Sequence, residues 1–428
     1  MTHFAILAPA AIGHLNPMSV LGRELQRRGH KVTFFGIPDL ELKLKNSDLS
    51  FSTIGETEFP PGSLEDYYKK LGQLSGLDGL KFTINWLKIE AKMLLNNAPT
   101  AFKSAGVEAV IVDQVTLPGG TIADFLNLPF VTVCNALLIN RETGVPPYFT
   151  SWNYSTNPLA LFRNRAGNFF LNKIGQPIRE VIQQQRREWN LPTYKTLDDH
   201  FSQLAQICQL PAEYDFPRVN LADCFHYTGP LKDPSGLEPI SFTEIEFPFD
   251  KLTGQPLIYA SLGTLQNRNL EVFETIACAC GGLDAQLVIS LGNPNHLEAD
   301  VQFTGSPLVV PYAPHQQLIE RASLVITHAG MNTVLGALAS GKPIVAIPIT
   351  NEQPGIAARL ARTGAGEVLN VKKLTVSKLR ELINRVLTEK SFQQNALRMQ
   401  EAIQSAGGVN RAADIIEQAI TTGKPVLR

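Results

Sequence analysis

The sequence has few charges and no surplus of either sign. Charged residues make up 18% of the 428 residues, below the roughly 25% typical of soluble proteins. The 38 Lys and Arg residues balance 39 Asp and Glu residues, so no basic excess can neutralise a nucleic-acid backbone and no nucleic-acid partner is predicted. Because 44% of the residues are hydrophobic, a large core is available, which argues against disorder.

Cysteines and long apolar runs are also scarce. The five cysteines form no C-x-x-C pair, which argues against a disulfide framework or structural zinc and for a reducing compartment. No run of 18 apolar residues occurs, so no transmembrane helix is expected. Residues 1–7 carry no Lys or Arg before their apolar stretch and do not resemble a signal peptide. We therefore expect a cytoplasmic protein.

Common catalytic signatures are missing as well. The chain contains no G-x-G-x-x-G, no G-x-x-x-x-G-K-S/T and no G-x-S-x-G, so these dinucleotide, P-loop and nucleophile-elbow motifs are absent. Several histidines are scattered through the chain without metal-ligand spacing. No metal site is predicted.

Strands and helices alternate as they do in parallel α/β sheets. A strand over 4–9, a turn at 12–14, a helix over about 17–28 and a strand over 30–36 form one βαβ unit. The pattern recurs over 107–133. Later strands are expected at 257–263, 285–290, 301–303, 308–310, 324–327 and 343–348, and helices near 170–190 and over 375–420.

A proline-rich segment divides the chain into two parts, as its length also suggests. Five prolines and several acids between 229 and 256 are typical of a linker. We expect one domain over 1–235, a linker over 236–256, a second domain over 257–410, and a helix over 411–428 that can cross back to the first domain. Two doubly wound, Rossmann-like domains would then face each other, with ligands in the cleft at the carboxyl ends of their strands.

The strongest candidate binding site follows the strand expected over 324–327. That strand leads to His328, a tight turn follows at Gly330, and a helix is expected to begin near Asn332 and Thr333 with these residues as caps. A helix N-terminus offers free N–H groups and a positive dipole end, which favour an anion such as phosphate. An ordinary capped helix beside an incidental histidine is an equally good interpretation of this piece alone.

The residues around this turn resemble the nucleotide-sugar signature of family 1 glycosyltransferases. The resemblance covers about a tenth of the chain closely, and the two-domain outline matches the GT-B architecture of that family. It implies that Tyr312, in place of the usual tryptophan, stacks on uracil, that His328 contacts the diphosphate and that Glu352 contacts the hexose. The implied nucleotide-sugar-binding residues are Gly13, Thr264, Tyr312, Ala313, His315, His328, Gly330, Asn332, Thr333, Glu352 and Gln353.

One position departs from the family pattern. The family usually has an acid four residues after the asparagine, where it binds the ribose hydroxyls, and this chain has Gly336. Ribose recognition would be either weaker or rerouted through His315 or Gln316, which leaves the choice between UDP and dTDP open. The turn at Leu262-Gly263-Thr264 matches the family's glycine turn, whose hydroxyl residue reaches the β-phosphate, although ordinary strand-end turns look the same.

The candidate catalytic residues are His14 and Asp113. Each stands at the end of an expected strand of the first sheet, so both can face the cleft. A histidine is suited to removing a proton from a hydroxyl, and a carboxylate behind it orients the ring. A lone histidine after a glycine is more often a turn residue. The resemblance reverses that preference, because Gly-His-Leu-Asn-Pro is the usual setting of the family's catalytic base and Val-Asp-Gln that of its partner acid.

Two interpretations of segment 148–174 stay open. The segment has seven aromatic residues, Arg163, Arg165 and Lys173. The family builds its acceptor pocket here, so the aromatics could form an apolar mouth in peripheral contact with a membrane. They could equally be core residues beside a solvated basic edge.

Together these features predict an inverting, metal-independent glycosyltransferase without a cofactor, in which a UDP-sugar is a co-substrate. It would move a hexose, glucose from UDP-glucose by preference, to a hydroxyl of an apolar small molecule. Among subfamilies, the motifs around His14, Asp113, 330–335 and 353–360 most resemble bacterial carotenoid (zeaxanthin-type) glucosyltransferases, which points to a hydroxylated carotenoid. Macrolides and flavonoid-type phenols are alternative acceptors, and a GT-B sugar-nucleotide epimerase or a non-catalytic UDP-sugar binder is an alternative function.

Overall fold

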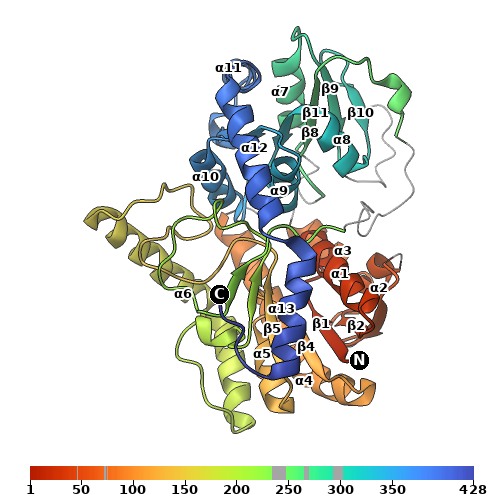
Figure 1. The fold of residues 1–428 in the computed structure, drawn as a ribbon, viewed down its shortest axis with the longest axis vertical. Coiled ribbons are helices and arrows are strands. Elements are labelled where there is room, and N and C mark those ends of the chain that lie inside the picture. Colours follow the sequence, from red (N-terminus) through yellow and green to blue (C-terminus); the bar gives the residue numbers. More distant parts are fainter. Residues whose placement is uncertain (46, 72–73, 75, 234–246, 265–268, 293–301) are drawn as a thin grey trace.

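The structure is a computed structural model, and it contains two separate parallel sheets (Figure 1). It describes residues 1–45, 47–71, 74, 76–233, 247–264, 269–292 and 302–428. Two expected doubly wound α/β sheets are therefore confirmed. Residues 236–246 of the expected linker lie outside the described residues, as does residue 301 of the expected strand over 301–303; residues 302–303 form no strand.

The first sheet has seven parallel strands in the order β3-β2-β1-β4-β5-β6-β7. The chain adds strands on one side of β1 and then returns to add β4 on the other, so the winding direction reverses between β1 and β4. The strands are β1 (His3–Leu7), β2 (Lys31–Gly36), β3 (Ser50–Thr53), β4 (Ala109–Asp113), β5 (Phe130–Cys134), β6 (Gln206–Cys208) and β7 (Phe225–Tyr227).

Helices flank this sheet, and every residue of β1 and β4 is buried, as expected of central strands covered on both faces. The helices are α1 (Ile12–Arg27), α2 (Asp39–Leu44), α3 (Ser63–Leu71), α4 (Gly76–Ala105), α5 (Pro118–Leu126) and α6 (Pro158–Glu188). Two of them begin earlier than expected. The residues expected to form a turn at 12–14 are the first turn of α1. Helix α6 begins at Pro158 because the Asn157 side chain accepts a hydrogen bond from Ala160 N and caps it.

The second sheet has six parallel strands in the order β10-β9-β8-β11-β12-β13, with its reversal between β8 and β11. Its strands are β8 (Leu257–Ser261), β9 (Gln286–Ser290), β10 (Leu308–Val310), β11 (Ala322–Thr327), β12 (Ile344–Ala346) and β13 (Gly366–Val368). Its helices are α7 (Leu270–Cys280), α8 (His315–Arg321), α9 (Met331–Ala339), α10 (Gln353–Thr363), α11 (Val376–Thr388) and α12 (Lys390–Ser405). Short 3₁₀ helices lie at Asp198–His200, Phe249–Lys251 and Val371–Lys373.

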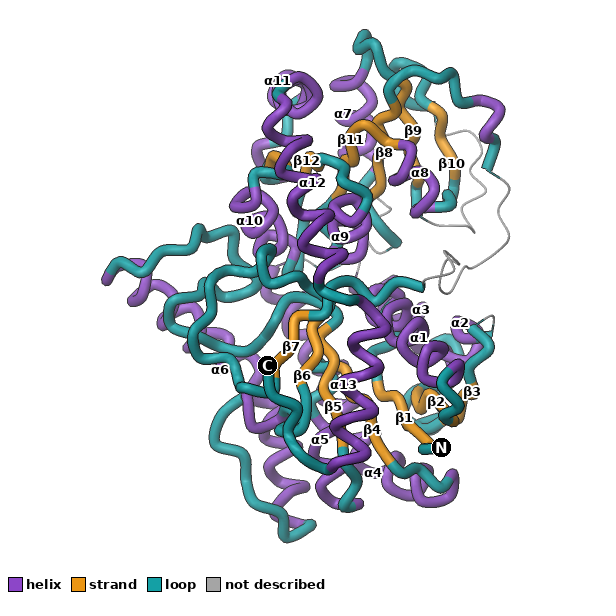
Figure 2. The backbone as a smooth tube through the Cα atoms, in the orientation of Figure 1, coloured by secondary structure: helices purple, strands orange, loops and turns teal. Residues whose placement is uncertain are grey.

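The C-terminal helix α13 (Gly408–Thr422) packs against α1, beside the first sheet (Figure 2). The Arg28 guanidinium lies 2.6 Å from a carboxylate oxygen of Asp414 and 2.6 Å from one of Glu417. The end of the chain thus returns from the second sheet to the first.

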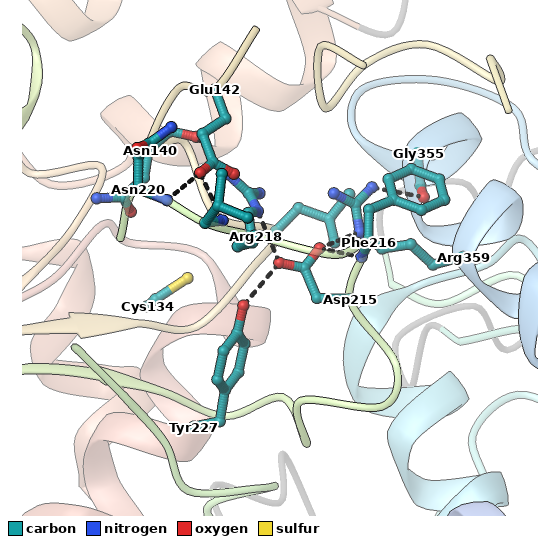
Figure 3. Close-up of polar contacts among 12 residues, drawn as sticks. Cys134, Asn140, Glu142, Asp215, Phe216, Arg218, Asn220, Tyr227, Gly355 and Arg359 are labelled. Atoms are coloured by element: carbon teal, nitrogen blue, oxygen red, sulfur yellow. Dashed lines mark hydrogen bonds and ion pairs between the residues drawn. The ribbon is translucent and has the colours of Figure 1, made fainter. Parts of the chain in front are cut away.

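A buried ion pair also joins the two halves (Figure 3). Arg359 of α10 donates from Nε to Asp215 Oδ1 over 2.7 Å, and both side chains are only 1% exposed. Arg218 and Tyr227 donate to the other carboxylate oxygen, each over 2.9 Å. The guanidinium of Arg359 also lies 4.3 Å from the centre of the Phe216 ring. Helix α10 is therefore fixed to the loop that follows β6.

Candidate active site

His14 and Asp113 meet where the first sheet reverses direction. His14 lies in the first turn of α1, after β1, and Asp113 is the last residue of the neighbouring strand β4. His14 Nδ1 is 2.7 Å from Asp113 Oδ2. The His14 side chain is 19% exposed and the Asp113 side chain 0%, so only the imidazole reaches solvent. With Nδ1–H donating to the carboxylate, neutral His14 presents its Nε2 lone pair as a proton acceptor.

Two further N–H groups hold the Asp113 carboxylate. Asn135 Nδ2 donates to Oδ2 over 2.7 Å, and the Val115 backbone N–H donates to Oδ1 over 3.0 Å. These bonds orient a fully buried charge and compensate for its lost hydration.

Sequence reasoning misses Asn135 and a second amide, Gln209. They directly follow β5 and β6, so both lie at the same sheet edge as Asp113. Gln209 Nε2 donates to Asn332 Oδ1 over 3.2 Å and thereby reaches the second half of the chain. The sequence pattern that could have identified Asn135 and Gln209 is a polar residue at or directly after the end of a buried strand, the pattern that also identifies Asp113.

The electrostatic surroundings favour a protonated His14. Burial alone would lower its pKa, but the charge and hydrogen bond of Asp113 outweigh burial, and the carboxylates of Glu352 and Glu90 add to them. The pKa of His14 is therefore raised above its ordinary value of 6.5.

Glu90 is a second carboxyl group near this pair that no sequence motif indicates. Burial, followed by repulsion from Asp113, raises its pKa to about 7. Its charge also acts on Tyr67 and Tyr68 of α3. The Tyr67 ring lies 4.4 Å from the Trp86 ring, centre to centre. An aromatic cluster from α3 and α4 therefore lies near His14, on the first-sheet side of the boundary at which Gly13 and Gln209 meet Asn332; we call this boundary the crevice.

The second sheet presents a compact turn at its own reversal point, after β8 and β11. The His328 ring packs against two glycines: a Cβ at Gly263 would lie 2.7 Å from it and a Cβ at Gly330 2.6 Å. Between His328 and Gly330, Ala329 has a φ of +66°, a backbone conformation that costs a non-glycine residue about 1–3 kcal/mol. Burial lowers the pKa of His328 to about 4 against the opposing effect of a hydrogen bond to the Ser261 backbone, so the ring is neutral at pH 7.

Asn332 and Thr333 do not cap the following helix, contrary to expectation. Gly330 is the N-cap of α9, and the first turn of this fully described helix contains no acidic residue. The Thr333 hydroxyl lies 3.2 Å from His315 Nε2, and Tyr259 OH lies 2.8 Å from His315 Nδ1. Both ring nitrogens of His315 are therefore engaged in holding Thr333 and Tyr259.

Asn332 forms a hydrogen bond to the first half of the chain, at a backbone carbonyl that Pro17 leaves without its helical donor. In α1 the residue at position 17 would normally donate to the Gly13 carbonyl one turn earlier, and proline cannot. The Gly13 oxygen instead accepts a hydrogen bond from Asn332 Nδ2 over 3.1 Å. The carbonyl left free by a proline in one half thus binds an amide of the other half.

Glu352 and Gln353 stand at the start of α10, beyond the end of β12. Gln353 Oε1 accepts from the backbone N–H groups of Ile349 and Thr350 over 2.8 and 2.9 Å, which fixes the orientation of its side chain. The charge of Glu352 contributes to the raised pKa values of His14 and Tyr148. Glu352 of the second half therefore lies close enough to His14 of the first for its charge to act on the imidazole.

The remaining predicted nucleotide-sugar residues lie along the second sheet's carboxyl edge. Thr264 follows the turn after β8, while the partly exposed Tyr312 and the buried Ala313 precede α8. Near Gly336, Lys232 Nζ donates to Gln316 Oε1 over 3.0 Å. Burial lowers the pKa of Lys232 to about 8. A lysine and an amide therefore occupy the neighbourhood of the missing acid.

Segment 148–174 is divided between the crevice and the surface. Any side chain at Gly355 would collide with the Tyr148 carbonyl, so this end of the segment packs against α10. Trp152 lies beneath the Arg163 guanidinium, 4.5 Å from ring centre to carbon. In contrast, Phe162, Phe169 and Phe170 are exposed on α6. The seven aromatic residues do not form one pocket.

The described residues contain neither a membrane-spanning helix nor a cluster of metal-binding side chains. None of their helices combines the length and the apolar character needed to cross a bilayer. In that same part of the chain, no group of three or more His, Cys, Asp or Glu side chains is arranged to hold a metal ion.

Comparison with known sequences places this geometry in context. Residues 6–405 match the family model described as "UDP-glucoronosyl and UDP-glucosyl transferase". A zeaxanthin glucosyltransferase from Pantoea ananas is 36% identical over all of this chain and 98% of that protein. A zeaxanthin glucosyltransferase from Pseudescherichia vulneris is 32% identical over the full length of both.

Solved structures share the fold. The calicheamicin glycosyltransferase has a TM-score of 0.74 at 21% identity, covering 99% of this chain and 100% of that one. A glycosyltransferase solved in complex with dTDP has a TM-score of 0.70 at 17% identity, covering 99% and 100%. The two facing sheets are those of the GT-B architecture.

Proposed function

The chain belongs to the family of UDP-glucuronosyl and UDP-glucosyl transferases, the family 1 glycosyltransferases, and from this membership we propose an inverting transfer of a hexose to an apolar alcohol. The observation that carries the proposal is the 2.7 Å bond between His14 and Asp113 on one wall of the crevice, with Glu352 acting on His14 from the other. Glucose from UDP-glucose is the preferred donor and a hydroxylated carotenoid the preferred acceptor, in agreement with the names of the two zeaxanthin glucosyltransferases.

In this mechanism His14 Nε2 removes the proton of the acceptor hydroxyl. The oxygen attacks the anomeric carbon from the face opposite the nucleotide, the bond from that carbon to the diphosphate breaks, and the configuration inverts. Asp113 holds the ring through Nδ1 and stabilises the imidazolium that forms. The proton ends on His14 and is released to solvent.

The second half would hold the donor. The N-terminus of α9 and the His328 N–H face the diphosphate, where their fixed dipoles stabilise the negative charge of the departing UDP without a metal ion. Bound diphosphate would also raise the low pKa of His328. Tyr312 stacks on the base, Thr264 reaches the β-phosphate, and Glu352 and Gln353 bind the hexose.

Ribose recognition would differ from the family pattern. We assign it to Lys232 and Gln316, which adjoin Gly336, instead of His315, whose ring nitrogens are both engaged. The acceptor would bind in the half built on the first sheet, beside Glu90 and the α3–α4 aromatic cluster. The corresponding division is 1–235 for the acceptor, 236–256 as linker, 257–410 for the donor, and 411–428 returning to the first half.

One assay separates this function from its alternatives. Purified enzyme is incubated with UDP-glucose, with and without hydroxylated carotenoids, macrolides and flavonoids, and UDP release and glycosylated products are measured by mass spectrometry. A transferase releases UDP only in step with product. An epimerase would convert the sugar without an acceptor, and a binder would release no UDP, and either result would overturn the proposal.

A further inference from the structure

The N-terminal half of α6 exposes a row of large apolar side chains. Leu159 is 81% exposed, Phe162 73%, Phe169 64% and Phe170 48%. Their spacing of three, seven and one residues places them on one face of the helix, with the exposed Ala166 between them. We call residues 159, 162, 166, 169 and 170 the α6 stripe. In Figure 1 this part of α6 lies at the left edge of the molecule.

The opposite face of the helix is firmly anchored. Ala160 and Asn164 are buried, and Asn164 Nδ2 donates to the Thr143 carbonyl over 3.1 Å. Gly167 allows close contact, because a Cβ there would lie 2.7 Å from Pro147 and 3.3 Å from Trp152. The stripe is therefore a fixed surface of a packed helix.

The exposed face changes character along the same helix. Beyond residue 173, the exposed positions of α6 are all polar or charged, as expected of a helix in water: Gln176, Glu180, Gln184, Arg187 and Glu188. Only the first half is apolar. An ordinary solvated helix would not switch in this way, so the stripe marks a contact surface.

The charge around the stripe has one sign. Between Glu142 and Glu180 the chain has no Asp or Glu, whereas it has four cations, Arg163, Arg165, Lys173 and Arg179. Arg165 and Lys173 are exposed next to the stripe, and Lys173 Nζ lies 5.8 Å from the Phe169 ring centre. Aromatic residues bordered by cations fit the interface of an anionic bilayer, in which the rings enter the acyl boundary and the cations meet the phosphates.

We propose that the α6 stripe docks this protein onto anionic membranes. A second copy of the chain is a poorer occupant, because a symmetric contact would bring Arg165 and Lys173 of both copies together without a nearby acid. The stripe also lies over the loop that leads through Trp152 and Tyr148 to the crevice. Docking would thus bring the proposed acceptor side close to lipid, although the docking itself does not depend on the reaction.

The test uses the full-length protein and vesicle flotation without any acceptor. Vesicles of phosphatidylcholine alone are compared with vesicles that also contain phosphatidylglycerol, at low and high salt. We expect the protein to co-float with the anionic vesicles at low salt, less so at high salt, and weakly with phosphatidylcholine alone.

Three variants separate the contributions. Phe162→Ser/Phe169→Ser/Phe170→Ser should reduce partitioning into anionic vesicles by about tenfold or more, since three rings no longer enter the interface. Arg165→Gln/Lys173→Gln should remove most of the preference for anionic lipid and its salt dependence. The control Leu42→Ser/Val219→Ser changes residues that are 80% and 85% exposed elsewhere, and it should float like the unchanged protein.

A fluorescence measurement on a single-residue variant tests the proposal even if the triple variant does not fold. In Phe169→Trp, vesicles should shift the added tryptophan emission to shorter wavelength, and brominated lipid should quench it. The proposal is overturned if the unchanged protein fails to float with anionic vesicles at low salt, or if the Phe variant floats equally well. It is also overturned if light scattering shows a dimer that the Phe variant converts to monomer without any vesicle binding.

Discussion

At the residue scale, the Asp113 carboxylate organises the candidate active site. It accepts hydrogen bonds from His14, Asn135 and Val115, and these three donors come from segments after β1, β5 and β4. These three hydrogen bonds hold the buried carboxylate in place, and it in turn fixes the imidazole in one tautomer. The arrangement leads to two predictions about His14.

We expect His14→Ala to lower turnover by about 10²–10⁴, since general-base catalysis is typically worth that factor. Binding of UDP-glucose, measured by calorimetry, should be nearly unchanged, because the proposed donor contacts lie in the other half. His30→Ala is the matched control, since His30 pairs with Glu417 on the far side of α1 and should retain activity. Full turnover in His14→Ala would rule out its role as the base.

The pH profile should report the raised pKa of His14. A base acts only when it is unprotonated, so kcat/KM should fall as the pH drops through a pKa above 6.5. In Asp113→Asn the Coulombic stabilisation of the imidazolium is lost while burial remains, so this acidic limb should move to lower pH and the plateau should fall. Measuring kcat/KM from pH 5 to 9 tests both effects. A limb that stays in place in Asp113→Asn would show that another group controls it.

At the scale of the element, α1 illustrates how one residue type alters a contact far along the chain. Pro17 withdraws the intrahelical donor for the Gly13 carbonyl, and Asn332 of α9 supplies the replacement. The same first turn of α1 carries His14, beside Asp113, so the contact with Asn332 lies next to the proposed base.

Replacing this proline should weaken the contact between the halves. In Pro17→Ala the new N–H competes for the Gly13 carbonyl, so Asn332 loses part of a bond worth about 0.5–1.5 kcal/mol. We expect the KM for UDP-glucose to rise about two- to tenfold, with kcat changed less. Asn332→Ala should raise KM at least as much, and an unchanged KM in both variants would show that the contact does not matter for the donor.

The N-terminus of α9 carries a further prediction at this scale. Its free N–H groups and the neighbouring His328 are proposed to neutralise the charge of departing UDP, as a metal ion does in other enzymes. EDTA should therefore leave the initial rate nearly unchanged, whereas Gly330→Val, which places side-chain atoms against the His328 ring, should lower it. A rate lost in EDTA and restored by Mg²⁺ or Mn²⁺ would contradict this assignment.

At the scale of the whole molecule, the two halves are joined by a buried ion pair as well as by the hydrogen bond between Asn332 and Gly13. The Asp215–Arg359 pair connects the loop after β6 to α10, and α10 begins directly after Glu352 (Figure 3). Burial would raise the pKa of Asp215, but Arg218 and Arg359 lower it to about 2. The pair thus helps to set the distance between Glu352 and His14.

Breaking this pair should be costly. Asp215→Ala leaves two buried guanidinium groups without their partner, so we expect the free energy of unfolding to fall by about 3–5 kcal/mol. Urea unfolding measures this change. Glu389→Ala is the control, because its pair with Arg385 is about half exposed and is worth no more than about 1 kcal/mol. Similar losses in the two variants would show that burial adds nothing at Asp215.

The stability contributed by Asp215 should depend on pH in one direction. Its pKa is lower in the folded state than the ordinary 3.8, so this contribution is fully present above about pH 4 and is lost as the pH falls toward about 2. Acid titration of the unchanged protein and of Asp215→Ala should therefore converge at low pH. Curves that remain parallel down to pH 2 would contradict the depressed pKa.

Local patterns were enough to predict the two α/β sheets and the sheet edges near which His14, Asp113 and His328 lie, but not that His14 and Asn332 stand in the first turns of α1 and α9. Buried strands of a parallel sheet appear as short apolar runs, and the residues directly after each run must lie at the carboxyl edge. The sequence alone also pointed to the family, through residues 312–354. It missed the start of α6, because exposed aromatics on the solvent side obscure the helical period there, although Asn157 and Pro158 signalled a helix start.

Only the tertiary structure decided which distant residues meet. Gly13 and Asn332 are 319 residues apart, Asp215 and Arg359 are 144 apart, and Glu90 stands in a helix without any motif. The spacing of apolar residues in the sequence indicates which face of a helix or strand is buried. Which residues of the two halves come into contact depends on how the two sheets are placed against each other. For the same reason segment 148–174 could not be divided in advance, since identical aromatic residues become crevice wall or exposed stripe only once α6 is packed.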